Sequence, residues 1–174
     1  RYSIFNKFQF LPTNKNTYPF NLSLRYMYEN RWGGEMDWTN EFRGGNLKYG
    51  ESILTNRLEF STGYQLPIKE KINWQTSFSI HDQKSWYGTV NYDAKQIIGF
   101  NQLTWHKKIN SKHQLLSGHS LRYNLYDDNT PATTQASIWW LPGFFVQDNF
   151  TLNSKNKILV GWRTDYHTKH GFVN

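Results

Sequence analysis

The sequence predicts an all-β fold of antiparallel strands, of the type that forms a transmembrane β-barrel. Aromatic residues make up 18% of the chain although hydrophobic residues total only 37%, and the mean hydropathy is −0.77. Many aromatics in a polar chain suit strands with one apolar face. Apolar and polar residues also alternate with period two, and short polar connections alternate with long ones. Each element is justified below in chain order.

Four hairpins, and therefore eight strands, follow from this alternation. The first covers residues 2–28 around Asn14-Lys15-Asn16, and the second covers 57–81 around Ile68-Lys69-Glu70. The third pairs 96–108 with 114–126 around Asn110-Ser111-Lys112, and the fourth covers 144–168 around Asn153-Ser154-Lys155-Asn156. The alternation changes phase between Phe100 and Leu103, which predicts a bulge or bend there. Asp148 interrupts an otherwise apolar run, and we interpret it as a strand end near polar headgroups.

The remaining connections are long: residues 30–56, 82–95 and 127–140. Short turns at one end and long loops at the other are typical of outer-membrane barrels, whose short turns are periplasmic and whose long loops are extracellular. Strands of about 9–11 residues match the tilted span of such a barrel. A soluble sandwich remains an alternative, because it would bury the same apolar faces against a second sheet.

Composition narrows the function classes. The chain has no run of 18 apolar residues, so no transmembrane helix is predicted. It has no cysteine, which excludes disulfides and cysteine-based metal sites. The net charge of +7 suits nucleic acid, an anionic membrane surface or an acidic ligand. Because no Lys/Arg stripe or nucleic-acid-binding motif is present, nucleic acid is not expected as a partner.

Several stretches resemble TonB-dependent outer-membrane receptors. Phe145-Val146-Gln147-Asp148 is followed by a polar turn and then by Arg163, Asp165, Tyr166 and His167. Residues 126–133, and Arg31-Trp32-Gly33-Gly34 with Tyr49-Gly50-Glu51-Ser52, carry the same resemblance. The family implies a barrel of 22 strands and an N-terminal plug domain. It also implies import of a scarce nutrient, of the iron-siderophore, haem or cobalamin type, driven by an inner-membrane energising complex.

The resemblance also sets expectations for organisation, location and partners. Residues 1–174 contain no plug domain, no energy-coupling box and no terminal aromatic, so we expect about eight strands from the interior of one larger barrel domain. The expected location is the cell outer membrane. The expected partners are outer-membrane lipid, the plug domain, the energising complex, a small-molecule ligand and, as a further candidate, a surface lipoprotein.

The long loops hold the candidate binding residues, because loops on a rigid scaffold often carry function. No G-x-S-x-G, H-E-x-x-H or phosphate-binding loop occurs, so an enzyme is not expected. Aromatic side chains can hold a bulky ligand at low entropic cost, although they also pin loops at headgroups or to one another. The ligand-binding candidates are Trp32, Trp38, His81, Asp82, Trp86, Tyr87, Tyr126, Asp128, Trp139, Trp140 and His167.

No cofactor or metal site is expected, with calcium in the extracellular loops as the weak alternative. Asp127 and Asp128 could supply oxygen ligands, but the spacing is not that of an EF-hand. His167 and His170 are predicted to point to opposite faces of one strand, so they should not share an ion. Four arginines on the polar faces predict a salt-bridge ladder, or contact with a plug or an anionic substrate: Arg25, Arg57, Arg122 and Arg163.

Two other functions remain open at this stage. A complete eight-stranded barrel with a structural or adhesive role fits the length, because eight strands make the smallest barrel of this kind. A soluble all-β carbohydrate-binding module fits the tryptophans of the loops.

Overall fold

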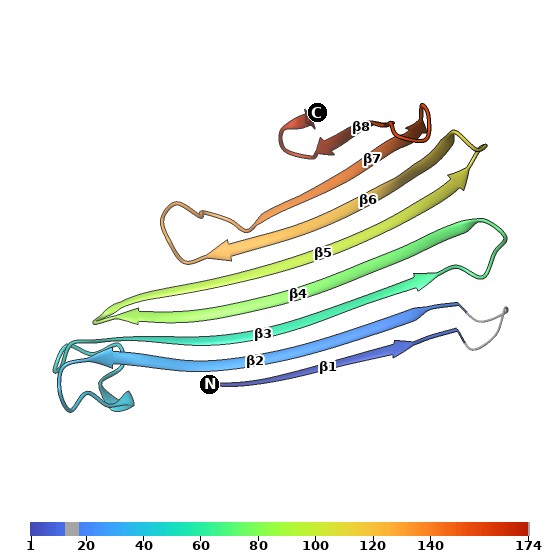
Figure 1. The fold of residues 1–174 in the computed structure, drawn as a ribbon. Helices are drawn as coiled ribbons and strands as arrows, with labels where there is room; N and C mark the ends of the chain where they lie inside the picture. Colours follow the sequence, from blue (N-terminus) through green and yellow to red (C-terminus); the bar gives the residue numbers. More distant parts are fainter. Residues whose placement is uncertain (13–17, 174) are drawn as a thin grey trace.

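The computed structural model describes residues 1–12 and 18–173, which form one antiparallel sheet of nine strands in sequential order. Figure 1 shows this sheet as a single curved layer, with no second layer on either side. The predicted turn Asn14-Lys15-Asn16 lies outside the described residues. The strands are β1 (Tyr2–Phe10), β2 (Phe20–Gly34), β3 (Gly50–Gln65), β4 (Lys71–Tyr87), β5 (Val90–Lys108), β6 (His113–Asp128), β7 (Ser137–Thr151), β8 (Lys157–His167) and β9 (Gly171–Val173).

The prediction of an all-β antiparallel fold is therefore confirmed, while the count of eight strands is one too low. The extra strand is β9, which pairs with the end of β8 after a short turn. In the described residues the sheet is open, with β1 and β9 at its two edges. No helix in this part of the chain is long and apolar enough to cross a membrane.

The strands are longer than predicted, and one predicted loop does not exist. Residues 82–95 were expected to form a long connection, but β4 and β5 pair up to Tyr87 and Val90, so only two residues connect them. The first of these, Gly88, has φ 59°, as a type II′ hairpin turn requires. The prediction failed because apolar alternation stops near Ile80, whereas the hydrogen-bonded pairing continues with polar side chains on both faces.

No bulge occurs between Phe100 and Leu103. The registers of β5 with β4 and with β6 run without interruption through both residues. The change of phase has another cause, since Phe100 lies on the polar side of the sheet. There its ring centroid is 6.0 Å from the guanidinium carbon of Arg122, which gives the ring a cationic partner.

Two of the short turns have the same sequence and the same geometry. In Asn110-Ser111-Lys112, the Asn110 side-chain oxygen accepts hydrogen bonds from the amides of Lys112 and His113 at 2.8 and 3.0 Å. In Asn153-Ser154-Lys155, Asn153 accepts from Lys155 and Asn156 at 2.9 Å each. An Asn side chain that binds the backbone two or three residues ahead stabilises a tight turn. The sequence therefore fixes where these hairpins reverse.

The longest described connection, residues 35–49, folds back against the sheet. It contains a 3-10 turn (Asn40–Phe42) and Trp38, the only buried large apolar side chain among the described residues, at 4% exposure. The Trp38 and Trp32 ring centroids are 5.3 Å apart. Arg43 anchors the same loop by donating hydrogen bonds to Ser52 at 3.0 Å and Asn30 at 2.8 Å.

Gly50 makes the packing of Trp38 feasible. A Cβ atom at Gly50 would lie 2.2 Å from Trp38 Nε1, whereas a Cβ atom at Gly33 would meet nothing within 4 Å. We expect Gly50→Ala to displace the indole and destabilise the loop by about 1–3 kcal/mol, the usual cost of overpacking. Gly33→Ala is the control and should have little effect. Protease sensitivity of residues 35–49 measures both, and equal sensitivity of the two variants would contradict this packing.

Candidate functional site

The sheet has one apolar face, and residues paired across neighbouring strands share it. Its representative members are Ile4, Phe8, Leu22, Leu24, Leu58, Phe60, Trp74, Phe78, Ile97, Leu103, Leu121, Tyr123, Phe144, Val146, Val160 and Trp162. Many of these side chains are well exposed, for example Ile4 at 63%, Val160 at 63% and Trp162 at 55%. Monomeric soluble proteins rarely expose an apolar surface of this extent. This face therefore requires a partner other than the described residues.

The apolar face has sharp borders. On β4 the side chains on this face run from Ile72 to Ile80, with Glu70 before them and Asp82 after them. The register places Asp82 opposite Lys95, and Lys95 opposite Asp127, so the second border continues across β5 and β6. Between the borders this face carries no Lys, Arg, Asp or Glu in the described part of the chain.

The height of this band is informative. Twelve positions separate Glu70, just before β4, from Asp82 on β4, and twelve separate Lys95 from Lys107 on β5. Twelve residues cover roughly 40 Å along a strand, or about 28 Å across a layer when the strand tilts by about 45°. The hydrocarbon core of a bilayer is about 30 Å thick.

The border at the short turns holds paired polar groups beside aromatic rings. Glu70 accepts a hydrogen bond from Trp105 Nε1 at 3.0 Å and pairs with Lys107 at 2.5 Å. Asp148 lies 2.6 Å from His113 Nδ1, and the His113 ring lies 4.6 Å from that of Phe150. The interruption by Asp148 is thus explained by a partner on the neighbouring strand, at the edge of the apolar band.

The opposite face is polar and follows the same registers. Its members include Arg25, Glu59, Gln75, Ser77, His81, Gln102, Gln114, Arg122, Gln147, Arg163 and Asp165. Glu59 forms ion pairs with Arg25 at 3.6 Å and with Arg57 at 2.6 Å, and Arg163 pairs with Asp165 at 2.8 Å. The predicted salt-bridge ladder is therefore present for three of the four arginines. The fourth, Arg122, contacts the ring of Phe100.

The predicted ligand-binding residues do not form one site, because strand alternation divides them between the faces. Trp32, Asp82 and Trp86 lie on the side of the apolar face, at or beyond its border, and Trp140 lies within this face, opposite Tyr123. His81, Tyr87, Tyr126, Asp128, Trp139 and His167 lie on the polar side. Trp38 is buried inside the 35–49 loop. Sequence distance along a loop could not reveal this division, since β4 and β5 extend through the segment that was taken as a loop.

A polar cluster joins β5, β6 and the start of the β6–β7 loop on the polar side. The hydroxyls of Tyr92 and Tyr126 are 2.9 Å apart. Asp128, the last residue of β6, accepts from the Thr130 hydroxyl at 2.6 Å and from its amide at 2.8 Å. These hydrogen bonds lower the pKa of Asp128 to about 2. Asp128 is therefore ionised at neutral pH and holds the start of the loop.

The prediction for His167 and His170 is wrong in its geometry. His170 lies in the turn between β8 and β9 rather than on the strand, and the two ring centroids are 4.6 Å apart. The ring centroids of Trp139 and His167 are 4.8 Å apart. However, His167 Nδ1 already accepts a hydrogen bond from the Lys169 amide at 3.1 Å. Among the described residues, no group of three His, Cys, Asp or Glu side chains is placed to hold a metal, and Asp127 and Asp128 alternate between opposite faces.

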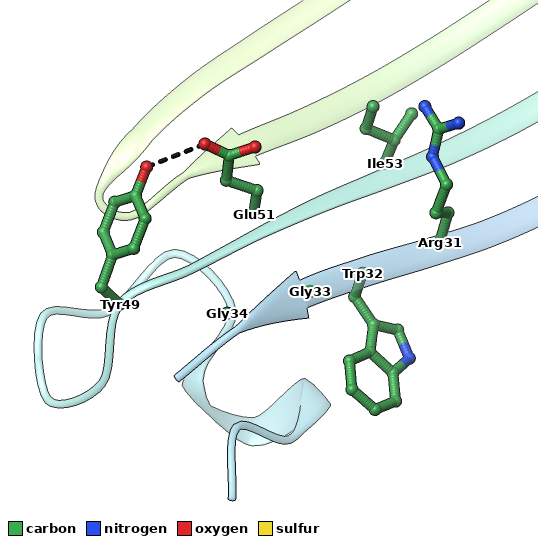
Figure 2. Close-up of a pocket in the computed structure, with 7 residues that line it drawn as sticks. All are labelled: Arg31, Trp32, Gly33, Gly34, Tyr49, Glu51 and Ile53. Atoms are coloured by element: carbon green, nitrogen blue, oxygen red, sulfur yellow. Dashed lines mark hydrogen bonds between the residues drawn. The ribbon is translucent and has the colours of Figure 1, made fainter. Parts of the chain in front are cut away.

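A hollow of about 450 Å³ lies where β2 and β3 join the loop of residues 35–49, and Trp32 is its one lining residue among the predicted ligand-binding residues. Figure 2 shows Arg31, Glu51 and Ile53 on one side of the two strands and Trp32 on the other. Tyr49 donates a hydrogen bond to Glu51 at 2.9 Å, and this bond with the Glu51 charge raises the pKa of Tyr49. The pairing of Gly33 with Glu51 is what brings the two segments of the family resemblance together.

Comparisons with known proteins leave the family unassigned: no family model matches the chain, and neither the curated proteins nor the solved structures give a match.

The Asp128 cluster gives a prediction for pH. The folded pKa of about 2 lies below the ordinary value of about 3.9, so the cluster stabilises the loop above about pH 4 and this contribution is lost as the pH falls towards 2. Thr130→Ala should raise the pKa of Asp128, because it removes the hydroxyl donor. Carbon NMR of the Asp128 carboxyl measures the midpoint. Thr134→Ala is the matched control, and an equal shift in both variants would count against the assigned hydrogen bond.

Proposed function

We propose that this chain forms part of the wall of an outer-membrane β-barrel that imports a scarce nutrient. The observation that carries the proposal is the uncharged apolar band, which is about as high as a bilayer core and is bordered by charged and aromatic side chains on β4–β7. A face of this kind suits lipid, and the polar face behind it suits a water-filled lumen.

The strand order also supports a barrel. Consecutive antiparallel strands in sequential order are the topology of barrels in the outer membrane. The longest described connection, residues 35–49, lies at the end of the sheet that also carries the two-residue β4–β5 turn. The open edges at β1 and β9 call for further strands, because unpaired backbone groups are not tolerated in hydrocarbon. In the proposed assembly this sheet is an internal segment of a larger barrel, and the ion-paired polar face lines its interior.

The import role rests on the resemblance to TonB-dependent receptors. In this proposal the nutrient is of the iron-siderophore, haem or cobalamin type. A plug domain contacts the polar face, and an inner-membrane complex supplies the energy. A surface lipoprotein could cover the outer ends of the strands, where Met36 and Leu47 are 91% and 84% exposed. Uptake of each radiolabelled nutrient, in cells with and without the gene that encodes this chain, tests the role directly. If the two kinds of cell take up all three nutrients equally, the import role is excluded.

Lipid contact predicts a difference between the two faces. Phe78 lies near the middle of the apolar band, and its neighbour Ser77 lies on the polar face. Phe78→Arg should destabilise the inserted protein by about 2–4 kcal/mol, whereas Ser77→Arg should be much milder. Denaturant titration in lipid vesicles measures both. Equal losses on the two faces would exclude lipid as the partner of the apolar face.

Orientation gives a second test, which uses the absence of native cysteine in this chain. Thr89→Cys places a thiol in the β4–β5 turn, and Ser154→Cys places one in the β7–β8 turn. In intact cells a membrane-impermeant maleimide should label only the first, because the β4–β5 turn lies at the same end of the sheet as the long connection of residues 35–49, and long connections face outward. Ser154→Cys should react only after the outer membrane is opened. Reaction of both variants in intact cells would contradict the proposed orientation.

A further inference from the structure

Much of the positive charge of the chain lies at the end of the sheet that carries the β3–β4, β5–β6 and β7–β8 turns. Seven lysines lie in or next to the three described short turns: Lys69, Lys71, Lys107, Lys108, Lys112, Lys155 and Lys157. The described residues at this end include only two carboxylates, Glu70 and Asp148. Both are engaged on the side of the apolar face, by Lys107 and His113 respectively. The cations on the polar side are therefore left without anionic partners.

A hollow of about 570 Å³ lies among these cations, at the ends of β4, β5, β6 and β7. No carboxylate lines it. Its polar lining includes Lys71, His106, Lys108, Gln114, Gln147 and Asn149. Leu115, Leu116 and Lys107 complete the lining, and the charge of Lys107 is paired with Glu70.

The strand registers place these side chains next to one another on the polar face. Lys71 is paired with His106 across β4 and β5. Lys108 is paired with Gln114, and Gln114 with Asn149, across β5, β6 and β7. Lys71 and Lys108 are exposed, and neither makes an ion pair in the described part of the chain. The result is two free ammonium groups beside three side-chain amides and one imidazole.

We propose that this hollow binds a soluble, multiply charged oxyanion, either a phosphate compound or a polycarboxylate. Ammonium groups attract such anions and donate strong, charge-assisted hydrogen bonds to them, and amide NH₂ groups supply further donors without adding negative charge. A concave surface lined by one sign of charge also raises the local concentration of the opposite ion. The site lies on the polar face, so a bilayer against the apolar face would not present its headgroups to it.

The proposal is independent of import. It depends on the arrangement of the polar face and would stand even if the apolar face contacted protein. Failure of the lipid tests would leave anion binding unaffected, and failure of anion binding would leave the lipid tests unaffected.

The experiment titrates pyrophosphate and citrate separately into the full-length protein that contains this chain, in detergent, by calorimetry. We expect saturable binding of at least one anion, and the tighter of the two identifies the ligand class. Lys71→Gln combined with Lys108→Gln should weaken it at least about tenfold, because two charge-assisted contacts are removed. Lys155→Gln combined with Lys157→Gln removes the same charge at the β7–β8 turn, outside the hollow, and should weaken it less than about twofold.

Two results would overturn the proposal. One is the absence of saturable binding of either anion up to millimolar concentration. The other is an equal loss of affinity in the two double variants, which would mean that the anions respond only to net charge. Circular dichroism of both variants checks that the sheet is intact, and since all four positions are exposed lysines, we expect it to be unchanged.

Discussion

The whole structure depends on an apolar sheet face that none of the described residues covers. Hydrophobic burial is the main driving force of folding, yet the described residues bury a single large apolar side chain, Trp38, and it belongs to a loop. Backbone hydrogen bonds and cross-strand pairs hold the strands together, but they do not remove this face from water. Its stability must come from outside the sheet. That requirement explains why the charged residues on this side lie at the borders of the band and why the ion pairs of the arginines lie on the opposite face.

Much of this arrangement could be predicted from the sequence. Alternate residues of a strand face opposite sides of the sheet, so their polarity indicates the environment of each face. The alternation from Leu58 to Ile80 identified a hairpin, and the Asn-Ser-Lys turns identified two reversals of the chain. Alternation failed as a guide where the side chains on the two faces have similar polarity. From Asp82 to Ser85 both sides of β4 are polar, so the hydrophobic pattern did not predict that the pairing continues to Tyr87. At Phe100 a ring on the polar face, stabilised by Arg122, imitated a bulge.

The candidate sites were harder to predict than the fold, because they depend on which strands meet. Single aromatic and acidic residues from the long connections were reasonable candidates, but a change of one position moves a side chain to the other face. Asp127 and Asp128 are neighbours in the chain and point to opposite sides. In contrast, Lys71, Lys108 and Gln114 come from three strands and share one hollow. Only the register brings them together, and composition alone indicated merely that the chain carries an excess of positive charge.

The strictly sequential strand order has a consequence for how the molecule assembles. Every strand pairs with its immediate neighbours in the chain, so each hairpin can form before the next is complete. The two-residue reversal at Gly88 costs less loop-closure entropy than the connection over residues 35–49. We therefore expect β4 and β5 to pair first, and the remaining strands to be added on either side of this pair. A sheet built this way has low contact order for a β-protein, which favours fast folding, and at each stage its growing edge serves as the template for the next strand.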